Sequence, residues 1–477
     1  MTRRFHLISL LLALSLSIAT GQKRALFKGP SVDLAHGQIR ISAEGRHFVH
    51  ADGTPFFWLG DTAWELFHRL SLAEAGRYLE DRRSKGFNVI QAVVLADLHG
   101  LSEPNPQGHT PLFDNDPARP DEAYFKDVDQ VVNQAEKLGM YIGMLPTWGD
   151  KFNKQWGFGP EIFTPENARV FGEFLGKRYK DKPVIWILGG DRIPETEAHF
   201  AIIRAMAQGL RAGDGGNHLI TYHTWGENSS SRYFHQDDWL DFNMIQSGHA
   251  ALDLPNFKFV QEDYGREPAK PVVDGEPRYE DHPVNWDPRK GFFNDFDVRQ
   301  AAYWAVLSGA AGHTYGNHCI WQMCSPDHEM LAYARYYWYD AMQHPGAVQM
   351  GYMRRLFESR PFQRLHPDQR MFISGPEEGP GYQCGAIADD GSFLVVYSPL
   401  GETVRIRLDG LAGDQATVWV FDPRTGKVQK NGTINKTDYW EFDLPGQPGR
   451  GNDWVIVVDS KNAGFPGPPA KKPYRKN

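Results

Sequence analysis

Short apolar segments rich in β-branched residues alternate with longer segments of helical periodicity between residues 55 and 344. This alternation is typical of repeated βα units around a parallel sheet. There are eight such apolar segments, the number that closes a TIM (β/α)₈ barrel, so we predict an α/β protein built on that fold. The predicted strands are residues 56–59, 89–95, 141–145, 184–188, 219–222, 242–246, 271–274 and 312–315.

The segments between these strands predict the outer helices. Residues 250–270 are polar and contain proline, so there we expect a short helix within a long loop. Long loops also follow the second and seventh strands, and in a barrel such loops build the active-site face. The predicted helices are residues 72–84, 122–138, 165–179, 197–211, 297–307 and 330–342.

The pattern changes after residue 348, which divides the chain into a barrel domain (22–348) and a smaller domain (349–460). Segments 383–388, 392–398, 403–408, 416–421 and 454–458 alternate with turns rich in Gly, Asp, Asn and Pro, which predicts an all-β sandwich. The proline-rich tail 461–477 is predicted to be disordered. Residues 37–50 also alternate like strands, and either pair with the second domain or cap the floor of the barrel.

Residues 1–21 have the pattern of a secretory signal peptide. Arg3 and Arg4 precede an apolar run at 7–18, and small residues at 19–21 offer a cleavage site before Gln22. The run is shorter than a membrane span requires. We therefore predict a periplasmic or secreted protein.

Charge and cysteine content restrict the partners and the redox chemistry. The net charge is −8, and becomes −10 when the two arginines of the signal are removed, which argues against nucleic acid as a partner. Cys319, Cys324 and Cys384 do not make a disulfide framework. A Cys319–Cys324 bridge and three unpaired buried thiols both remain open.

The fourth predicted strand ends in a carboxylate. Residues 184–191 read Val-Ile-Trp-Ile-Leu-Gly-Gly-Asp, so Asp191 lies at the carboxyl end of the strand, where barrels carry their catalytic groups. The glycines allow a ligand to approach the backbone closely. A helix cap, or a surface pair with Arg192, is the structural alternative. We predict that Asp191 is catalytic.

The seventh predicted strand supplies a second carboxylate. Asp274 and Glu276 share one strand face by the two-residue period, with Glu276 at the rim before Pro277 and Asp274 deeper as an orienting group. A calcium site or a loop ion-pair cluster with Glu280 is the alternative. Carboxylates on strands four and seven face each other across the barrel mouth, as a glycosidase requires, and their separation distinguishes a retaining from an inverting mechanism.

Polar and aromatic residues also fall at the ends of the other strands. A sugar pocket needs aromatic faces for C–H surfaces and fixed partners for hydroxyls. Arg192 and Arg278 flank the two carboxylates, and we predict that they bind uronic carboxylates in bidentate fashion. The predicted substrate-binding residues are Asp61, Trp64, His99, Trp148, Arg192, His223, Trp225, Gln246, His249, Arg278, His318 and Trp321.

Motifs of rival chemistries are missing from the sequence. It has no Walker loop, no Gly-x-Gly-x-x-Gly after a strand and no Gly-x-Ser-x-Gly elbow. The first strand does not end in the His-x-His pair of metal-dependent amidohydrolases, although a metal-dependent hydrolase stays a minor alternative. We predict neither a metal nor a cofactor.

Three segments resemble glycoside hydrolase family 140, the apiosidases: residues 55–64 (Pro-Phe-Phe-Trp-Leu-Gly-Asp-Thr-Ala-Trp), residues 186–191 and the Gly275-Glu276 pair. The resemblance covers roughly residues 30 to 345. The remainder resembles the β-domain that follows such barrels and carries a collagen-binding label.

This resemblance implies a retaining enzyme that cleaves an apiosyl linkage in the pectic polysaccharide rhamnogalacturonan II. Asp191 would be the acid/base and Glu276 the nucleophile. The Gly-Gly-Asp segment departs from the Asn-Glu ending that many retaining barrel glycosidases carry on strand four, so generic rules for those enzymes transfer less safely. A glycosidase for another plant glycan and a non-catalytic exported glycan-binding protein are the alternatives.

Overall fold

The computed structural model describes residues 28–375 and 378–468. The predicted signal peptide lies outside the described residues, as does the end of the predicted disordered tail from residue 469 onward.

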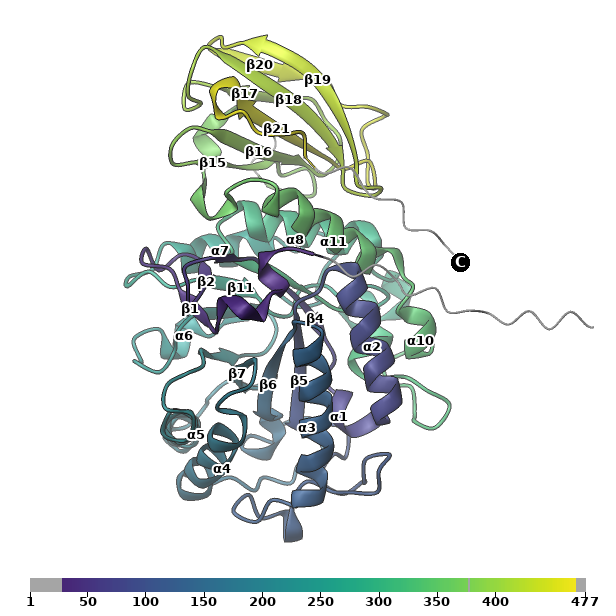
Figure 1. Cartoon of the computed structure of the whole chain (residues 1–477). Helices are drawn as coiled ribbons and strands as arrows, with labels where there is room; N and C mark the ends of the chain where they lie inside the picture. Colours follow the sequence, from purple (N-terminus) through teal and green to yellow (C-terminus); the bar gives the residue numbers. More distant parts are fainter. Residues whose placement is uncertain (1–27, 376–377, 469–477) are drawn as a thin grey trace, which may run out of the picture.

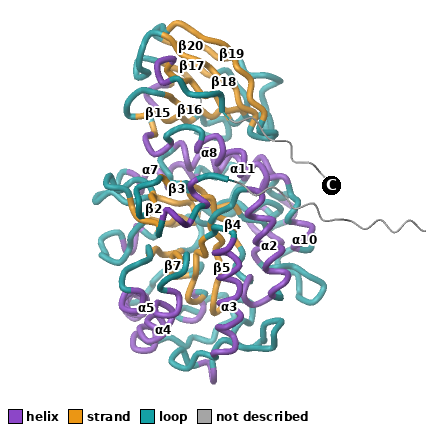
Figure 2. The backbone as a smooth tube through the Cα atoms, viewed as in Figure 1, coloured by secondary structure: helices purple, strands orange, loops and turns teal. Residues whose placement is uncertain are grey.

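Eight parallel strands form a nearly closed barrel surrounded by helices, and each corresponds to a predicted strand (Figures 1 and 2). The sheet runs in the order β8-β7-β6-β5-β4-β12-β11-β10, with the short β9 (Asn228–Ser229) pairing antiparallel to β10. β8 and β10 are not paired as strands, and individual hydrogen bonds connect them instead. For example, Thr221 Oγ1 donates to the Phe242 carbonyl at 2.6 Å. The parallel strands are β4 (Trp58–Thr62), β5 (Val89–Leu95), β6 (Tyr141–Thr147), β7 (Val184–Gly189), β8 (Ile220–His223), β10 (Asn243–Gln246), β11 (Val272–Asp274) and β12 (Gly312–Tyr315).

A small sheet closes the floor of the barrel. Strands β1 (Ile39–Ile41), β2 (Phe48–His50) and β3 (Pro55–Phe56) pair antiparallel, and the Phe48 ring lies 5.1 Å from the Phe242 ring, edge to face. Phe48 also packs on Trp58, the first residue of β4. Of the two alternatives for residues 37–50, the structure therefore shows the floor cap.

The outer helices follow the predicted ranges with one exception. Ser71, Thr164 and Asn294 begin three of them with reciprocal capping bonds, which satisfy otherwise free backbone N–H groups. The expected short helix in the loop before β11 is α7. The helices are α1 (Leu66–Arg69), α2 (Leu72–Lys85), α3 (Glu122–Lys137), α4 (Pro165–Tyr179), α5 (Glu197–Asp214), α6 (Ser231–Phe234), α7 (Asn256–Tyr264), α8 (Asp295–Leu307), α9 (His318–Trp321), α10 (Trp338–Ala341) and α11 (Pro345–Glu358).

The helix predicted at residues 330–342 is wrong for most of its length, because only α10 is helical there. Ala332 and Tyr333 have φ angles of 49° and 64°, outside the helical region. Leu331 N donates to Gln322 Oε1 at 2.8 Å, which ties this segment to the end of α9. The helix that packs against α8 and α2 after the last barrel strand is α11.

The second domain is a β-sandwich, as predicted (Figure 1). A six-stranded sheet in the order β13-β15-β16-β21-β18-β19 packs on a three-stranded sheet β14-β17-β20, with Val396, Ile406 and Ile456 in the core between them. Strands β19 and β20 escape prediction because their alternation is mostly polar and exposed. The strands are β13 (Leu365–Pro367), β14 (Phe372–Ser374), β15 (Cys384–Ala388), β16 (Phe393–Ser398), β17 (Val404–Arg407), β18 (Gln415–Asp422), β19 (Lys427–Asn435), β20 (Tyr439–Phe442) and β21 (Trp454–Ser460).

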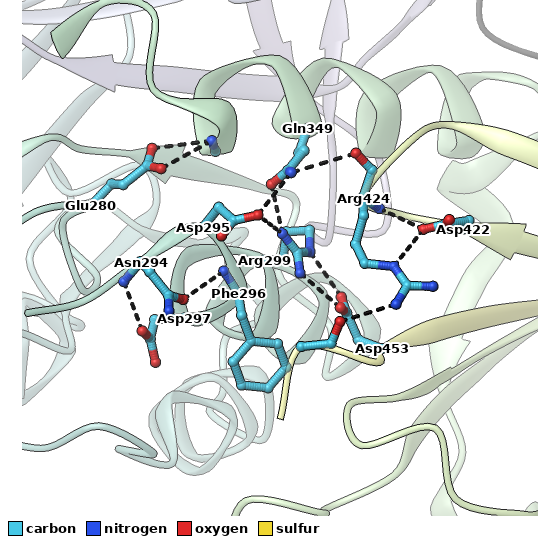
Figure 3. Close-up of polar contacts among 12 residues, drawn as sticks. Glu280, Asn294, Asp295, Phe296, Asp297, Arg299, Gln349, Asp422, Arg424 and Asp453 are labelled. Carbon is cyan, nitrogen blue, oxygen red and sulfur yellow. Dashed lines mark hydrogen bonds and ion pairs between the residues drawn. The ribbon is translucent and has the colours of Figure 1, made fainter. Parts of the chain in front are cut away.

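A buried ion pair and neighbouring hydrogen bonds join the two domains (Figure 3). Arg299 of α8 makes two hydrogen bonds to Asp453, at 2.9 and 2.8 Å, and both side chains are buried. Gln349 accepts from Arg299 at 2.7 Å and donates to the Arg424 carbonyl at 3.4 Å. The predicted domain boundary at 348/349 therefore falls inside α11, a helix that packs on the barrel.

Candidate active site

Asp191 lies at the end of β7 on a sharply turned backbone. Asp191 itself has a φ of 55°, and Gly189 and Gly190 also have positive φ. A Cβ on Gly189 would lie 2.1 Å from the His223 carbonyl oxygen, so only glycine lets the chain pass this close to β8. The turn leaves the Asp191 side chain 24% exposed at the mouth of the barrel.

Glu276 lies just beyond the end of β11, and histidines face both of its oxygens. His249 Nε2 is hydrogen-bonded to Oε1 at 3.2 Å, and His223 Nε2 lies 3.0 Å from Oε2. All three side chains are buried. The carboxylate is therefore fixed in position rather than free to rotate.

His223 connects Glu276 to Asp191. Its Nδ1 accepts the Asp191 backbone N–H at 3.2 Å, so in the neutral ring the proton lies on Nε2, which faces Glu276. The rings of Trp64 and Trp148 lie 5.2 and 6.0 Å from the His223 ring. These contacts hold the imidazole in one orientation.

The two carboxyl groups have opposite pKa shifts. Burial, together with the negative charge of Glu276, raises the pKa of Asp191 to about 7. Burial also disfavours the charged form of Glu276, but the contacts with His223 and His249 outweigh it and lower that pKa to about 2. Near neutral pH one carboxyl can hold a proton while the other is ionised, which is the division of labour between an acid and a nucleophile or base.

Asp274 does not share a face with Glu276, contrary to the prediction. Its carboxylate accepts from Ser247 Oγ at 2.8 Å and from Asn256 Nδ2 of α7 at 3.0 Å, so it points into the helix layer. The strand ends at Asp274, and Gly275 breaks the two-residue alternation before Glu276. Glu280 is also buried, between Tyr315 and the first turn of α11.

Asp61 is not a substrate-binding residue. Its carboxylate is fully buried, accepts the Tyr78 hydroxyl at 2.5 Å and pairs with Arg82, both on α2. Leu59 packs in the same layer between strands and helices. The two-residue period of β4 therefore directs Asp61 away from the barrel mouth.

The structure also contradicts uronate binding by the two arginines. Arg192 is fully buried, and its guanidinium donates to three backbone carbonyls, those of Asn153, Lys154 and Asp191. Arg278 is buried too: it donates to the Leu252 carbonyl and to Gln300, and lies against the Trp304 ring. Neither guanidinium presents a free bidentate edge to a ligand.

The remaining predicted residues fall into three groups. The first group surrounds the carboxylate pair and consists of Trp64, Trp148, His223, Gln246 and His249. The contact with Gln246 lowers the pKa of Asp191 and so offsets part of its rise. His99 and Trp225 lie further out, where His99 packs on Phe158 at 4.1 Å and Trp225 on Trp156 at 5.7 Å. His318 is buried, donates to the Ala332 carbonyl and accepts from Trp321 Nε1, so both of its nitrogens are occupied.

Sequence reasoning missed three aromatic residues near the pair. Burial and the charge of Glu276 raise the pKa of Tyr279 well above its usual range, so its hydroxyl stays protonated beside that carboxylate. Trp156 and Trp286 are 62% and 53% exposed on loops after β6 and β11. Tyr279 could have been found from its position three residues beyond Glu276, whereas loop residues carry no periodic signal.

Within residues 28–375 and 378–468, no group of three or more His, Cys, Asp or Glu side chains is arranged to hold a metal ion. No helix in the same part of the chain is long and apolar enough to cross a membrane.

Known families match both domains. The model of the apiosidase-like catalytic domain matches residues 42–364, and that of a domain named for collagen binding, described from a collagenase, matches residues 366–459. A sequence search of curated proteins finds no significant match.

Solved structures resemble nearly the whole chain. A glycoside hydrolase is 32% identical with a TM-score of 0.83, and the match covers 90% of this chain and 98% of that one. A glycoside hydrolase family 5 protein from Bacteroides vulgatus is 31% identical with a TM-score of 0.84, over 90% and 95% of the two chains. Barrel, site and neighbours together define a glycoside hydrolase. The chain belongs to the apiosidase-like family.

Proposed function

We propose that this glycoside hydrolase is a retaining enzyme that cleaves apiosyl linkages in pectic rhamnogalacturonan II. Asp191 would be the acid/base and Glu276 the nucleophile. The observation that carries the proposal is the carboxyl pair at the ends of β7 and β11, with one pKa raised to about 7 and the other lowered to about 2. The apiosidase-like family supports the choice of sugar.

In the first step a Glu276 oxygen bonds to the anomeric carbon while the bond to the leaving oxygen breaks. The Asp191 proton moves to that oxygen, so the leaving group departs neutral. His223 and His249 hold the carboxylate in position for the attack. The hydroxyl of Tyr279 adds a further neutral polar group beside it.

In the second step Asp191, now ionised, takes a proton from water. The water oxygen bonds to the anomeric carbon as the Glu276 ester bond breaks, which restores both carboxyl groups to their starting states. Because two displacements occur at the same carbon, the anomeric configuration is retained. The raised pKa of Asp191 allows the group to serve first as acid and then as base near neutral pH.

The test is to incubate the purified protein with rhamnogalacturonan II and its side-chain oligosaccharides, and to identify released sugars by mass. Glu276→Ala runs alongside as the control. Release of apiose-terminated fragments by the wild type alone supports the proposal. If sugars are released only from other plant glycans, the protein is a glycosidase with a different substrate. If Glu276→Ala releases sugars as the wild type does, Glu276 is not the nucleophile.

We also propose that the protein is exported and that the β-sandwich stabilises the barrel. Export rests on the pattern of residues 1–21, and amino-terminal sequencing of the mature protein should begin at Gln22. The structural role of the sandwich rests on the buried ion pair between Asp453 and Arg299 of α8. A protein that keeps Met1 and is recovered only from the cytoplasmic fraction would contradict the first point.

A further inference from the structure

An exposed aromatic rim stands beside Asp191. Trp156 belongs to the loop after β6 and Trp225 follows β8 by two residues, and their rings stack at 5.7 Å with an interplanar angle of 25°. Trp156 remains 62% exposed in this contact. The two stacked rings together form an exposed apolar patch, and such patches often mark binding surfaces.

Arg192 joins this rim to the proposed acid. Its guanidinium carbon lies 4.2 Å from the centre of the Trp156 ring, and its Nη1 lies 3.5 Å from Asp191 Oδ2. Three backbone carbonyls fix the guanidinium from other sides. The same buried cation therefore supports the tryptophan and places it next to Asp191.

The loop that carries Trp156 is anchored along its length. Gly159 N donates to Asp150 Oδ2 at 2.7 Å, and Gln155 Nε2 donates to Glu195 Oε2 at 2.7 Å. A Cβ on Gly157 would lie 2.3 Å from the Asp150 Cβ, so the loop packs too closely there for any side chain. The exposed ring is thus presented by a fixed backbone, as a preformed binding surface requires.

We propose that Trp156 and Trp225 form the subsite for the leaving-group saccharide, with the apolar face of its sugar ring stacked on the tryptophans. The inference rests on the proposed function, because the leaving group lies on the side of the acid. Aromatic rings bind the C–H faces of sugars. Since Arg192 is buried and occupied by carbonyls, this subsite recognises the sugar face and not a uronic carboxylate.

The test compares two substrates with the same apiosyl group: a side-chain oligosaccharide, whose leaving group is a saccharide, and apiosyl fluoride, whose leaving group is a single ion. Trp156→Ala should lower kcat/KM for the oligosaccharide about tenfold or more and leave the fluoride within about twofold. Trp156→Phe should restore most of the loss. Tyr439→Ala removes another exposed aromatic ring, on the β-sandwich, and should change neither rate.

Three outcomes separate the inference from the proposed function. An equal loss on both substrates, or no loss on the oligosaccharide, overturns the subsite while the enzyme remains an apiosidase. Trp225→Ala removes the second ring of the stacked pair and should reproduce the selective loss. If the wild type cleaves neither apiosyl substrate, the proposed function is wrong. The subsite is then tested by comparing Trp156→Ala with the wild type on the glycan that the enzyme does cleave and on the matching glycosyl fluoride.

Discussion

His223 contacts both halves of the carboxyl pair, since its Nε2 lies 3.0 Å from Glu276 Oε2 and its Nδ1 accepts the Asp191 backbone N–H at 3.2 Å. One imidazole ring thus contacts both the nucleophile and the turn that carries the acid. Trp64 and Trp148 hold its ring in place. The spacing of the two carboxyl groups therefore depends on a residue that performs no chemistry itself.

Removing this connection should disturb the low pKa of Glu276. In His223→Ala the carboxylate keeps its burial and loses one of two stabilising contacts, so its pKa should rise and the acidic limb of the kcat/KM profile should move to higher pH. We expect kcat to fall about tenfold or more. His235→Ala, at a buried histidine bonded to Asn243, is the control and should leave the limb in place. An unchanged limb in His223→Ala would contradict this account.

The basic limb of the kcat/KM profile against pH should report the pKa of Asp191. Activity needs this carboxyl protonated, so kcat/KM should decline as the pH rises through about 7. Because the charge of Glu276 helps to raise the pKa of Asp191, Glu276→Gln should lower it. Carbon-13 NMR titration of the labelled aspartates measures this shift directly in the inactive variant. A pKa of Asp191 that is the same in both proteins would show that the two groups do not interact.

Asp61 should matter for stability and not for substrate. Asp61→Asn removes one of the two carboxylates paired with the buried Arg82 guanidinium and leaves Asp81, so the loss of stability should stay below the ~3–5 kcal/mol typical of a buried charge left without a partner. Chemical denaturation should show this loss, while KM at a temperature where the variant is folded should stay unchanged. A raised KM with unchanged stability would indicate that Asp61 does contribute to substrate binding.

The interface between the domains should contribute to the stability of the barrel. Asp453→Asn removes the carboxylate that pairs with the buried Arg299 across the domain interface and leaves only its pair with Asp295 on α8, so the melting temperature should fall. A chain ending after Arg364 retains α11 and should melt lower still or aggregate. Arg405→Ala breaks an exposed pair with Glu441 within the β-sandwich and is the control, with little expected change. A truncated barrel that melts like the full chain would contradict the structural role.

The barrel was predictable because the same strand and helix pattern recurs eight times along the sequence. Eight buried strands and their helices follow two simple periods, and errors arose where local bonds override periodicity, as at Ala332 and Tyr333. The outer helix after β12 is α11, and the predicted domain boundary at 348/349 falls within this helix.

The site was only partly predictable. Asp191 and Glu276 follow from their place at strand ends. Strict alternation along β4, with Leu59 and Asp61 on one face, would have excluded Asp61. The burial of Arg192 depends on carbonyls of a distant loop, and the exposure of Trp156 depends on how that loop folds, so neither follows from local sequence.

The most direct test of the central claim is to trap the covalent intermediate. An activated 2-fluoro glycoside of the released sugar slows both steps, and hydrolysis of the glycosyl-enzyme is further slowed in Asp191→Ala. Digestion and mass spectrometry then locate the added sugar. The account predicts a single modified peptide with the sugar on Glu276. A sugar on another carboxylate, or none on the protein while turnover of the natural substrate proceeds, would contradict it.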